Sequence, residues 1–316
     1  MRPVFADPKT DFVFKRLFGS EAHKDLTIAL LNTLLGLEGD RRIATVTFLR
    51  EEERPRVPEM KLSIVDVKCQ DHRGTRYVVE MQVLNVEGFD KRVVYNASKA
   101  YVNQLGVGQE YPALDDVVAV SICDFVLWPD APGEPPVPLV SRWRMQERAH
   151  GRVGLTQVQY VFVELPKFAR DQVPTSVVEE WAYVFRNAEG LRAVPDVLHA
   201  DETRRALEAA RTAAFNEADW DAYDRTRIAE QDARGALALA LHQGRAEGRV
   251  EGRVEGRAEG RAEGAARMLL LVLRGHGLAV SPTHEAQILA THDLGRIEGW
   301  TQRALTARTA DDALAD

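Results

Sequence analysis

The segment SIVDVKCQDHRGTRYVVEMQV, at residues 63–83, constrains the fold more than any other stretch of the chain. Two runs rich in β-branched residues flank the sequence DHRGT, whose residues suit a short turn, so the segment predicts a β-hairpin. A loop at residues 72–74 would place Asp66 opposite Glu80. Because side chains alternate between the faces of a strand, several polar residues would share one face of this hairpin: Asp66, Lys68, Glu80 and Gln82.

Two carboxylates directly opposite each other repel, so the pair Asp66 and Glu80 is unfavourable unless a cation lies between them. Mg²⁺ takes oxygen ligands, commonly one or two carboxylates together with water and phosphate oxygens. It would also activate a water molecule and neutralise charge on a phosphodiester, so the pair indicates metal-assisted hydrolysis. The alternative is a solvated strand face, since a shift of one residue would place Asp66 opposite Val79 or Met81.

The segments around the hairpin predict a mixed α/β domain rather than a helical bundle or a β-sandwich. Apolar residues at helical spacing predict a pair of amphipathic helices within residues 11–37 and a further helix at 89–106. Apolar runs at 115–128 and 156–165 predict buried strands. The order is therefore helices, hairpin, helix, strand and strand.

Beyond residue 174 the pattern becomes helical, and the chain divides into three predicted parts. Residues 1–230 form the α/β domain. Residues 231–265 contain five consecutive units of the sequence GRAE or GRVE and form a repeat helix or linker. Residues 266–316 form a small all-α module of three short helices, the second opened by Ser281 as its cap.

The four-residue repeat at 244–264 makes a poor isolated helix. In a helix, arginine follows arginine and glutamate follows glutamate at the i,i+4 spacing, and glycine recurs with the same period. One interpretation is that the glycine stripe packs closely against another helix, so that these residues and the C-terminal helices form a homo-oligomer. The other is a flexible repeat without a chemical role. A basic DNA-binding arm is not expected, because each arginine is balanced by a glutamate.

Composition narrows the class of protein. The formal net charge of −7 argues against a surface that coats nucleic acid nonspecifically, although it permits a local basic groove. The two cysteines form no CxxC motif, so neither a disulfide framework nor a zinc site is expected. The longest apolar run, MLLLVL at 268–273, is too short to span a bilayer, and no apolar leader opens the sequence. We therefore expect a cytoplasmic protein with no membrane partner.

Several segments outside the hairpin, like the hairpin itself, resemble the corresponding segments of one protein family. They are DPKTDFVFKRLFGS at 7–20, the stretch from FDKRVVYN to SICDF at 89–125, VELPKF at 163–168 and EEWAYVFRNA at 179–188. Together with the hairpin, they resemble the bacterial recombination-promoting nuclease/transposase family of the PD-(D/E)XK nuclease superfamily, over about residues 7–240. The resemblance implies a PD-(D/E)XK nuclease-like mixed central sheet flanked by helices, here with an all-α C-terminal extension.

The resemblance also implies a set of functional residues. The metal-binding carboxylates of the superfamily fall on Asp66 and Glu80. Gln82 stands where the superfamily has lysine, and a neutral glutamine would orient the attacking water without adding positive charge. Asp11, in the first helix, would be an additional acid. The residues that would contact DNA phosphates are Lys15, Lys68 and Arg92.

The activity that follows is Mg²⁺-dependent hydrolysis of DNA by an endonuclease linked to recombination or mobile elements. An alternative is a catalytically inert, oligomeric DNA- or protein-binding scaffold derived from the nuclease fold. A third interpretation is a helical assembly protein in which the carboxylates of the hairpin are only surface charges.

Overall fold

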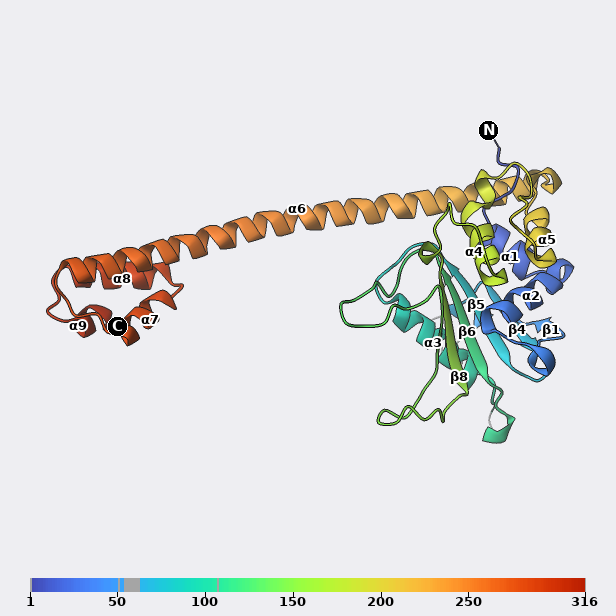
Figure 1. Ribbon diagram of the computed structural model, residues 1–316, viewed down its shortest axis with the longest axis horizontal. Coiled ribbons are helices and arrows are strands. Elements are labelled where there is room, and N and C mark those ends of the chain that lie inside the picture. Colours follow the sequence, from blue (N-terminus) through green and yellow to red (C-terminus); the bar gives the residue numbers. More distant parts are fainter. Residues whose placement is uncertain (1, 51, 54–62, 107, 316) are drawn as a thin grey trace. The chain divides into compact units, whose positions relative to one another are not determined.

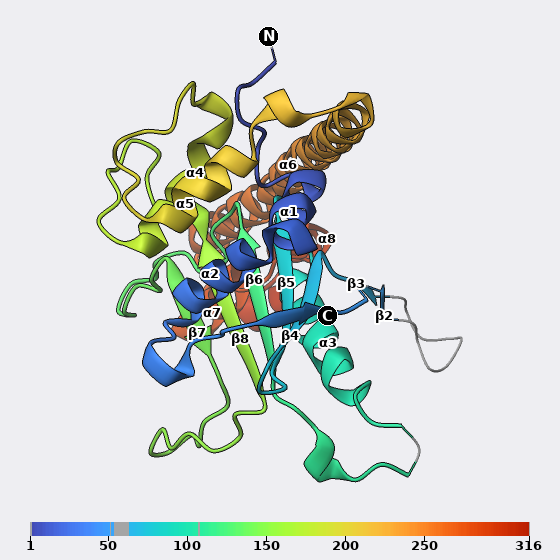
Figure 2. The same ribbon diagram turned by 90° about the vertical axis from the view of Figure 1, so that its right-hand side faces the viewer.

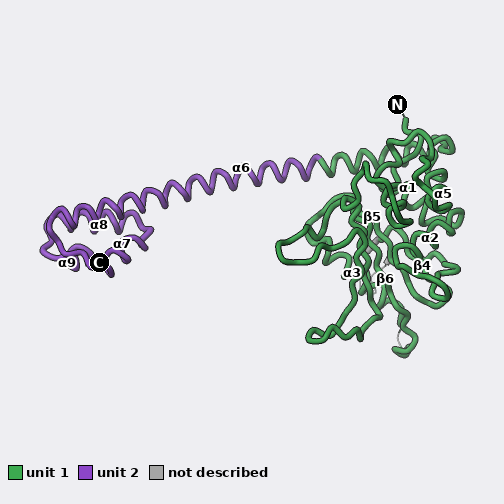
Figure 3. The backbone as a smooth tube through the Cα atoms, in the orientation of Figure 1, with its two compact units in different colours: residues 1–234 green, residues 235–316 purple. Residues whose placement is uncertain are grey.

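The computed structural model describes residues 2–50, 52–53, 63–106 and 108–315. The chain forms two compact units, residues 1–234 and residues 235–316, coloured green and purple in Figure 3. The hairpin and all the site residues named above belong to the first unit.

The first unit is built on a mixed sheet of six strands (Figure 1). In spatial order the strands are β1 (Val46–Phe48), β4 (Val67–Asp71), β5 (Arg76–Gln82), β6 (Val117–Cys123), β8 (Val158–Glu164) and β7 (Val140–Trp143). The neighbours β5, β6 and β8 run parallel, and the outer pairs are antiparallel. A separate antiparallel ladder joins β2 (Glu52–Glu53) to β3 (Ser63–Ile64). The predicted mixed sheet is confirmed.

The predicted helices of the first unit are also present. They are α1 (Asp11–Phe18), α2 (Lys24–Leu35), α3 (Phe89–Val102), α4 (Val177–Asn187) and α5 (Asp201–Ala209). Single turns of 3-10 helix lie at Glu21–His23, Gly39–Arg41, Tyr111–Ala113, Leu165–Lys167, Ala188–Gly190 and Thr212–Ala214. Gly36 ends α2 with φ 62°, a left-handed conformation in which its N–H donates to the carbonyls of Asn32 and Thr33.

Helices cover both faces of the sheet, as Figures 1 and 2 show. Val93 of α3 belongs to the same apolar cluster as Val78 on one face. Phe14 of α1 and Trp181 of α4 belong to the cluster that contains Val79 on the other face. Every residue of β6 is buried between these layers, which explains its uninterrupted apolar sequence.

The hairpin formed by β4 and β5 has the predicted turn and register. Val67 pairs with Val79, which requires the loop at residues 72–74. Gly74 in this loop has φ 96°, a backbone conformation that strains residues with a side chain. The register therefore fixes which residues of β5 face α3.

The first strand of the hairpin is shorter than predicted. β4 begins at Val67, whereas Ser63–Ile64 pairs with β2 instead of extending the ladder with β5. Asp66 lies at a bend between β3 and β4. This corrects the prediction that Asp66 occupies a ladder position opposite Glu80, because the strand breaks at this residue and its side chain is directed by another contact.

Some short elements were not predicted. β1 and β7 contain three and four residues, respectively, and so few residues give no recognisable alternation of apolar side chains. β7 follows the proline-rich segment between β6 and β8 and adds an edge strand to the sheet.

The second unit begins within a long helix, α6 (Glu217–Gly275), and contains most of it. The whole four-residue repeat lies in α6. It is followed by α7 (Pro282–Leu289), α8 (Leu294–Ala304) and α9 (Ala310–Leu314). Ser281 caps α7 as predicted, because its hydroxyl accepts from the N–H of His284. The first of the three predicted short helices is the end of α6, and α9 was not predicted. Trp300 lies in the apolar core of this unit.

No helix of the described part of the chain is long and apolar enough to cross a membrane.

Candidate active site

Glu80 lies on β5 and faces α3, where 8% of the residue remains exposed. The side-chain amide of Asn96 donates to Oε1 of Glu80 at 2.5 Å, and the guanidinium of Arg92 lies 3.9 Å from Oε2. Asn96 and Arg92 are one turn apart on α3, so both reach the same carboxylate. Burial raises the pKa of Glu80, whereas the charge of Arg92 and the hydrogen bond from Asn96 lower it. Glu80 is therefore not a solvated surface charge.

Asp66 is positioned by the backbone of the neighbouring strand. Its Oδ2 accepts a hydrogen bond from the N–H of Met81 at 2.7 Å. The pKa of Asp66 is raised to about 7: burial is the largest cause and the charges of Asp11 and Glu80 also raise it, whereas the Met81 N–H and the charge of Lys15 lower it. The bend thus brings Asp66 near Glu80 although the two residues are not a ladder pair.

The charges of Asp11 and Lys15 both act on the pKa of Asp66, which places the two residues near it. Asp11 is the first residue of α1, and 54% of its side chain is exposed. The ammonium of Lys15, one turn further along α1, lies 2.9 Å from Oδ1 of Asp11. The structure therefore brings both predicted residues to the side of the site formed by α1.

Gln82 already has partners within the protein. Its carboxamide oxygen accepts from Arg92 at 2.5 Å, and its amide nitrogen donates to the carbonyl of Leu84 at 2.7 Å. A carboxamide has two donors and two lone pairs, so Gln82 keeps one of each for a further partner. Arg92 links the side chain of Gln82 to that of Glu80.

Lys68 does not lie on a solvated strand face. It pairs with Val78, which packs toward α3, and only 7% of the residue is exposed. Burial, and then the charge of Arg76, lower the pKa of Lys68 to about 8. In this structure the side chain of Lys68 is therefore too buried to contact a DNA phosphate.

Sequence reasoning missed Asn96, a polar partner of Glu80, and Asp124, whose backbone contacts Gln82 while its carboxylate lies toward Arg234. Asn96 was hidden within a helix, although its spacing of four residues from Arg92 places both on one face of α3. Asp124 follows β6, and its N–H donates to the carbonyl of Gln82 at 2.9 Å. Burial raises the pKa of Asp124, whose carboxylate lies 3.8 Å from Arg234.

The fold is a mixed α/β sheet flanked by helices, with two buried carboxylates close to an arginine at one face. The chain belongs to the PD-(D/E)XK nuclease family transposases, because the model of that family matches residues 8–240. The match includes every candidate site residue described above. A comparison with curated proteins and a comparison with solved structures each gave no match.

Proposed function

We propose that the protein is a Mg²⁺-dependent DNA endonuclease in which Asp66 and Glu80 bind the metal. The observation that carries this proposal is the burial of two carboxylates near each other, each with a raised pKa. Burying like charges is costly, and a divalent cation would offset that cost. Membership of a nuclease family of transposases supports DNA as the substrate and a role in recombination or mobile elements.

The donor atoms fit Mg²⁺ without a third acidic ligand. No group of three or more His, Cys, Asp or Glu side chains suited to a metal occurs among the described residues. Mg²⁺, however, is commonly held by only one or two carboxylates, with water and phosphate oxygens completing its coordination. Asp66 uses Oδ2 for the N–H of Met81, and Glu80 uses Oε1 for Asn96, which leaves Oδ1 and Oε2 as ligands.

Bound metal would supply a nucleophilic water and would stabilise charge on the phosphodiester. Gln82 would orient the attacking water with its remaining donor and lone pair. Arg92, whose side chain is 40% exposed, would contact a DNA phosphate while it holds Gln82 in place. Lys15 would contact a second phosphate, and Asp11 would add a carboxylate to the site. The buried Lys68 would contact a phosphate only after DNA binding exposes its ammonium group.

Nicking of supercoiled plasmid by the purified full chain tests the proposed activity. We expect nicked product with Mg²⁺ or Mn²⁺ and none with EDTA, because the hydrolytic water depends on the metal. A folded protein that binds DNA but produces no nicks with either metal would favour the inert, oligomeric scaffold derived from the nuclease fold.

We also propose that α6 forms a homo-oligomer through residues 244–264. In the single chain the side chains of the first four repeat units are exposed, and a Cβ added at any of the repeat glycines meets no atom within 4 Å. A helix with glycine at every fourth position is weak alone, so a second helix packed on the glycine stripe would account for its stability.

Replacing Gly248, Gly252 and Gly256 by alanine separates this proposal from a flexible repeat. Each change favours the helix by about 1 kcal/mol, so the chain should gain helicity in circular dichroism. The added methyl groups would nevertheless block close packing, and light scattering should show loss of the oligomer. Val250→Ala with Val254→Ala, on another stripe of the same helix, is the control. An oligomer that survives the glycine changes would contradict the proposed interface.

A further inference from the structure

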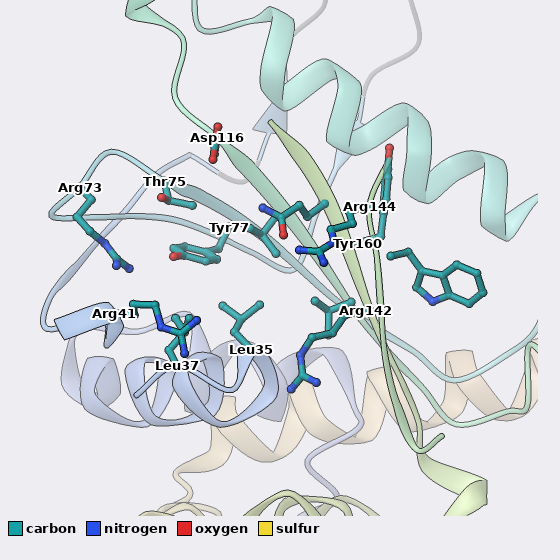
Figure 4. Close-up of a pocket in the computed structure, with 14 residues that line it drawn as sticks. Leu35, Leu37, Arg41, Arg73, Thr75, Tyr77, Asp116, Arg142, Arg144 and Tyr160 are labelled. Atoms are coloured by element: carbon teal, nitrogen blue, oxygen red, sulfur yellow. The ribbon is translucent and has the colours of Figure 1, made fainter. Parts of the chain in front are cut away.

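A polar cavity lies away from the carboxylates of the candidate active site. Its volume is about 550 Å³, and Thr75, Asp116 and Gln159 place it where β5, β6 and β8 begin (Figure 4). Tyr77, which also lines it, packs on the face of the sheet covered by α1, α2 and α4, whereas Glu80 faces α3. The part of the cavity lined by Tyr77 therefore lies across the sheet from Glu80.

Arginine dominates the charge of this cavity. The charged residues that line it are Arg41, Arg73, Arg142, Arg144 and a single acid, Asp116. Such a concentration of positive charge contrasts with the net charge of −7 of the whole chain. In Figure 4 Arg41 and Arg142 lie toward α2, and Arg144 lies beside Tyr160.

The fold holds one of these arginines in place. Arg142 donates from Nε and Nη2 to the carbonyl of Leu34 at 3.1 and 2.7 Å, in the last turn of α2. Gly36 permits this approach, since a Cβ there would lie 3.3 Å from Nη2 of Arg142. The guanidinium is thus fixed at the cavity by a backbone carbonyl and not by an acid.

The positive charges of the cavity are largely uncompensated. Arg73 pairs with Asp71 at 2.8 Å, but Arg41, Arg142 and Arg144 form no ion pair with any carboxylate of the described residues. Like charges gathered around one cavity repel each other, and an anionic ligand would relieve this repulsion.

We propose that this cavity binds the phosphate group of a nucleotide unit, either as a free nucleotide or at the 5′ end of a DNA strand. Guanidinium groups match the oxygens of a phosphate in bidentate geometry and keep their charge at every physiological pH. The volume falls in the range of sites that hold small molecules. The apolar side chains of Leu35 and Leu37 supply a surface for the base. The inference is independent of the proposed nuclease activity.

Calorimetric titration of the full chain in EDTA tests this site without engaging a metal. The ligands are dAMP, deoxyadenosine, and a short single strand of DNA with a 5′-phosphate or a 5′-hydroxyl. The double variant Arg41→Gln with Arg144→Gln removes two of the unpaired charges. Arg148→Gln with Arg152→Gln makes the same change of charge at exposed positions outside the cavity.

We expect at least about tenfold tighter binding of the ligands that carry the 5′-phosphate, and a loss of at least about tenfold in the cavity variant only. Tighter binding of dAMP would identify a free nucleotide as the ligand, and tighter binding of the phosphorylated strand would identify a DNA end. Binding that ignores the 5′-phosphate, or that falls equally in both double variants, would overturn the proposal.

Discussion

Replacing Glu80 by glutamine, or Asp66 by asparagine, is expected to lower metal-dependent DNA cleavage by at least about 100-fold. Both changes remove a negative charge while keeping an oxygen in the same place. Glutamine at 80 would still accept from Asn96, and asparagine at 66 would still accept from the N–H of Met81. The fold should therefore persist, and the loss would report the charge that holds the metal.

The initial rate of plasmid nicking by proteins purified in parallel measures this loss. Asp130→Asn makes the same change of charge at an exposed loop position and serves as the control. Cleavage by either site variant within about twofold of the unchanged protein would show that the nicking came from elsewhere, since removing a metal ligand costs far more.

Asp71→Ala is expected to destabilise the hairpin that carries Glu80 by about 3 kcal/mol. The side chain of Asp71 is fully buried, and its carboxylate accepts from the backbone N–H groups of Arg73 and Thr75 and from the hydroxyl of Tyr77. It also pairs with the guanidinium of Arg73. Alanine would leave the N–H groups of the turn and the buried hydroxyl of Tyr77 without their acceptor.

Amide hydrogen exchange in β5 measures this effect within the first unit alone. Faster exchange of Val78 and Val79 is expected, because these residues pair with β4 across the turn. Asp71→Asn should have a smaller effect, since its amide oxygen can still accept from the backbone of the turn. Unchanged protection in Asp71→Ala would contradict the role given to this carboxylate.

The turn and register of the hairpin could be predicted because their signals are local. The sequence DHRGT specifies a short loop, and the alternation on both sides allows few pairings. The bend at Asp66 could not be predicted, because the alternation continues through it without a break. At this bend the carboxylate of Asp66 accepts a hydrogen bond from the N–H of Met81, a residue 15 positions away, and Asp66 does not pair with β5 as a ladder residue.

The surroundings of Glu80 depended on tertiary packing. The sequence shows that 89–106 is helical but not which face of the sheet this helix covers. Because α3 packs over Glu80, Asn96 becomes a hydrogen-bond partner of the carboxylate and Lys68 becomes buried. Both facts required the structure, whereas the identity of Asp66 and Glu80 as candidates required only their place in the hairpin.

The affinity of the site for metal should rise with pH. Burial raises the pKa of Asp66 to about 7, so this carboxyl group is protonated below that pH and must lose its proton to bind a cation. Without metal, the stability of the folded protein should instead fall as the pH rises. A raised pKa contributes stability at low pH, and this contribution is lost as the pH rises through 7.

Binding of Mn²⁺ to the full chain, measured by calorimetry at pH 6 and pH 8, tests most directly whether Asp66 and Glu80 form a metal site. In the proposed mechanism cleavage also requires Gln82 to orient the water, whereas metal binding requires only the two carboxylates. We predict tighter binding at pH 8 and a loss of at least about tenfold in both Asp66→Asn and Glu80→Gln. Equal binding by the unchanged protein and both variants would contradict the assignment.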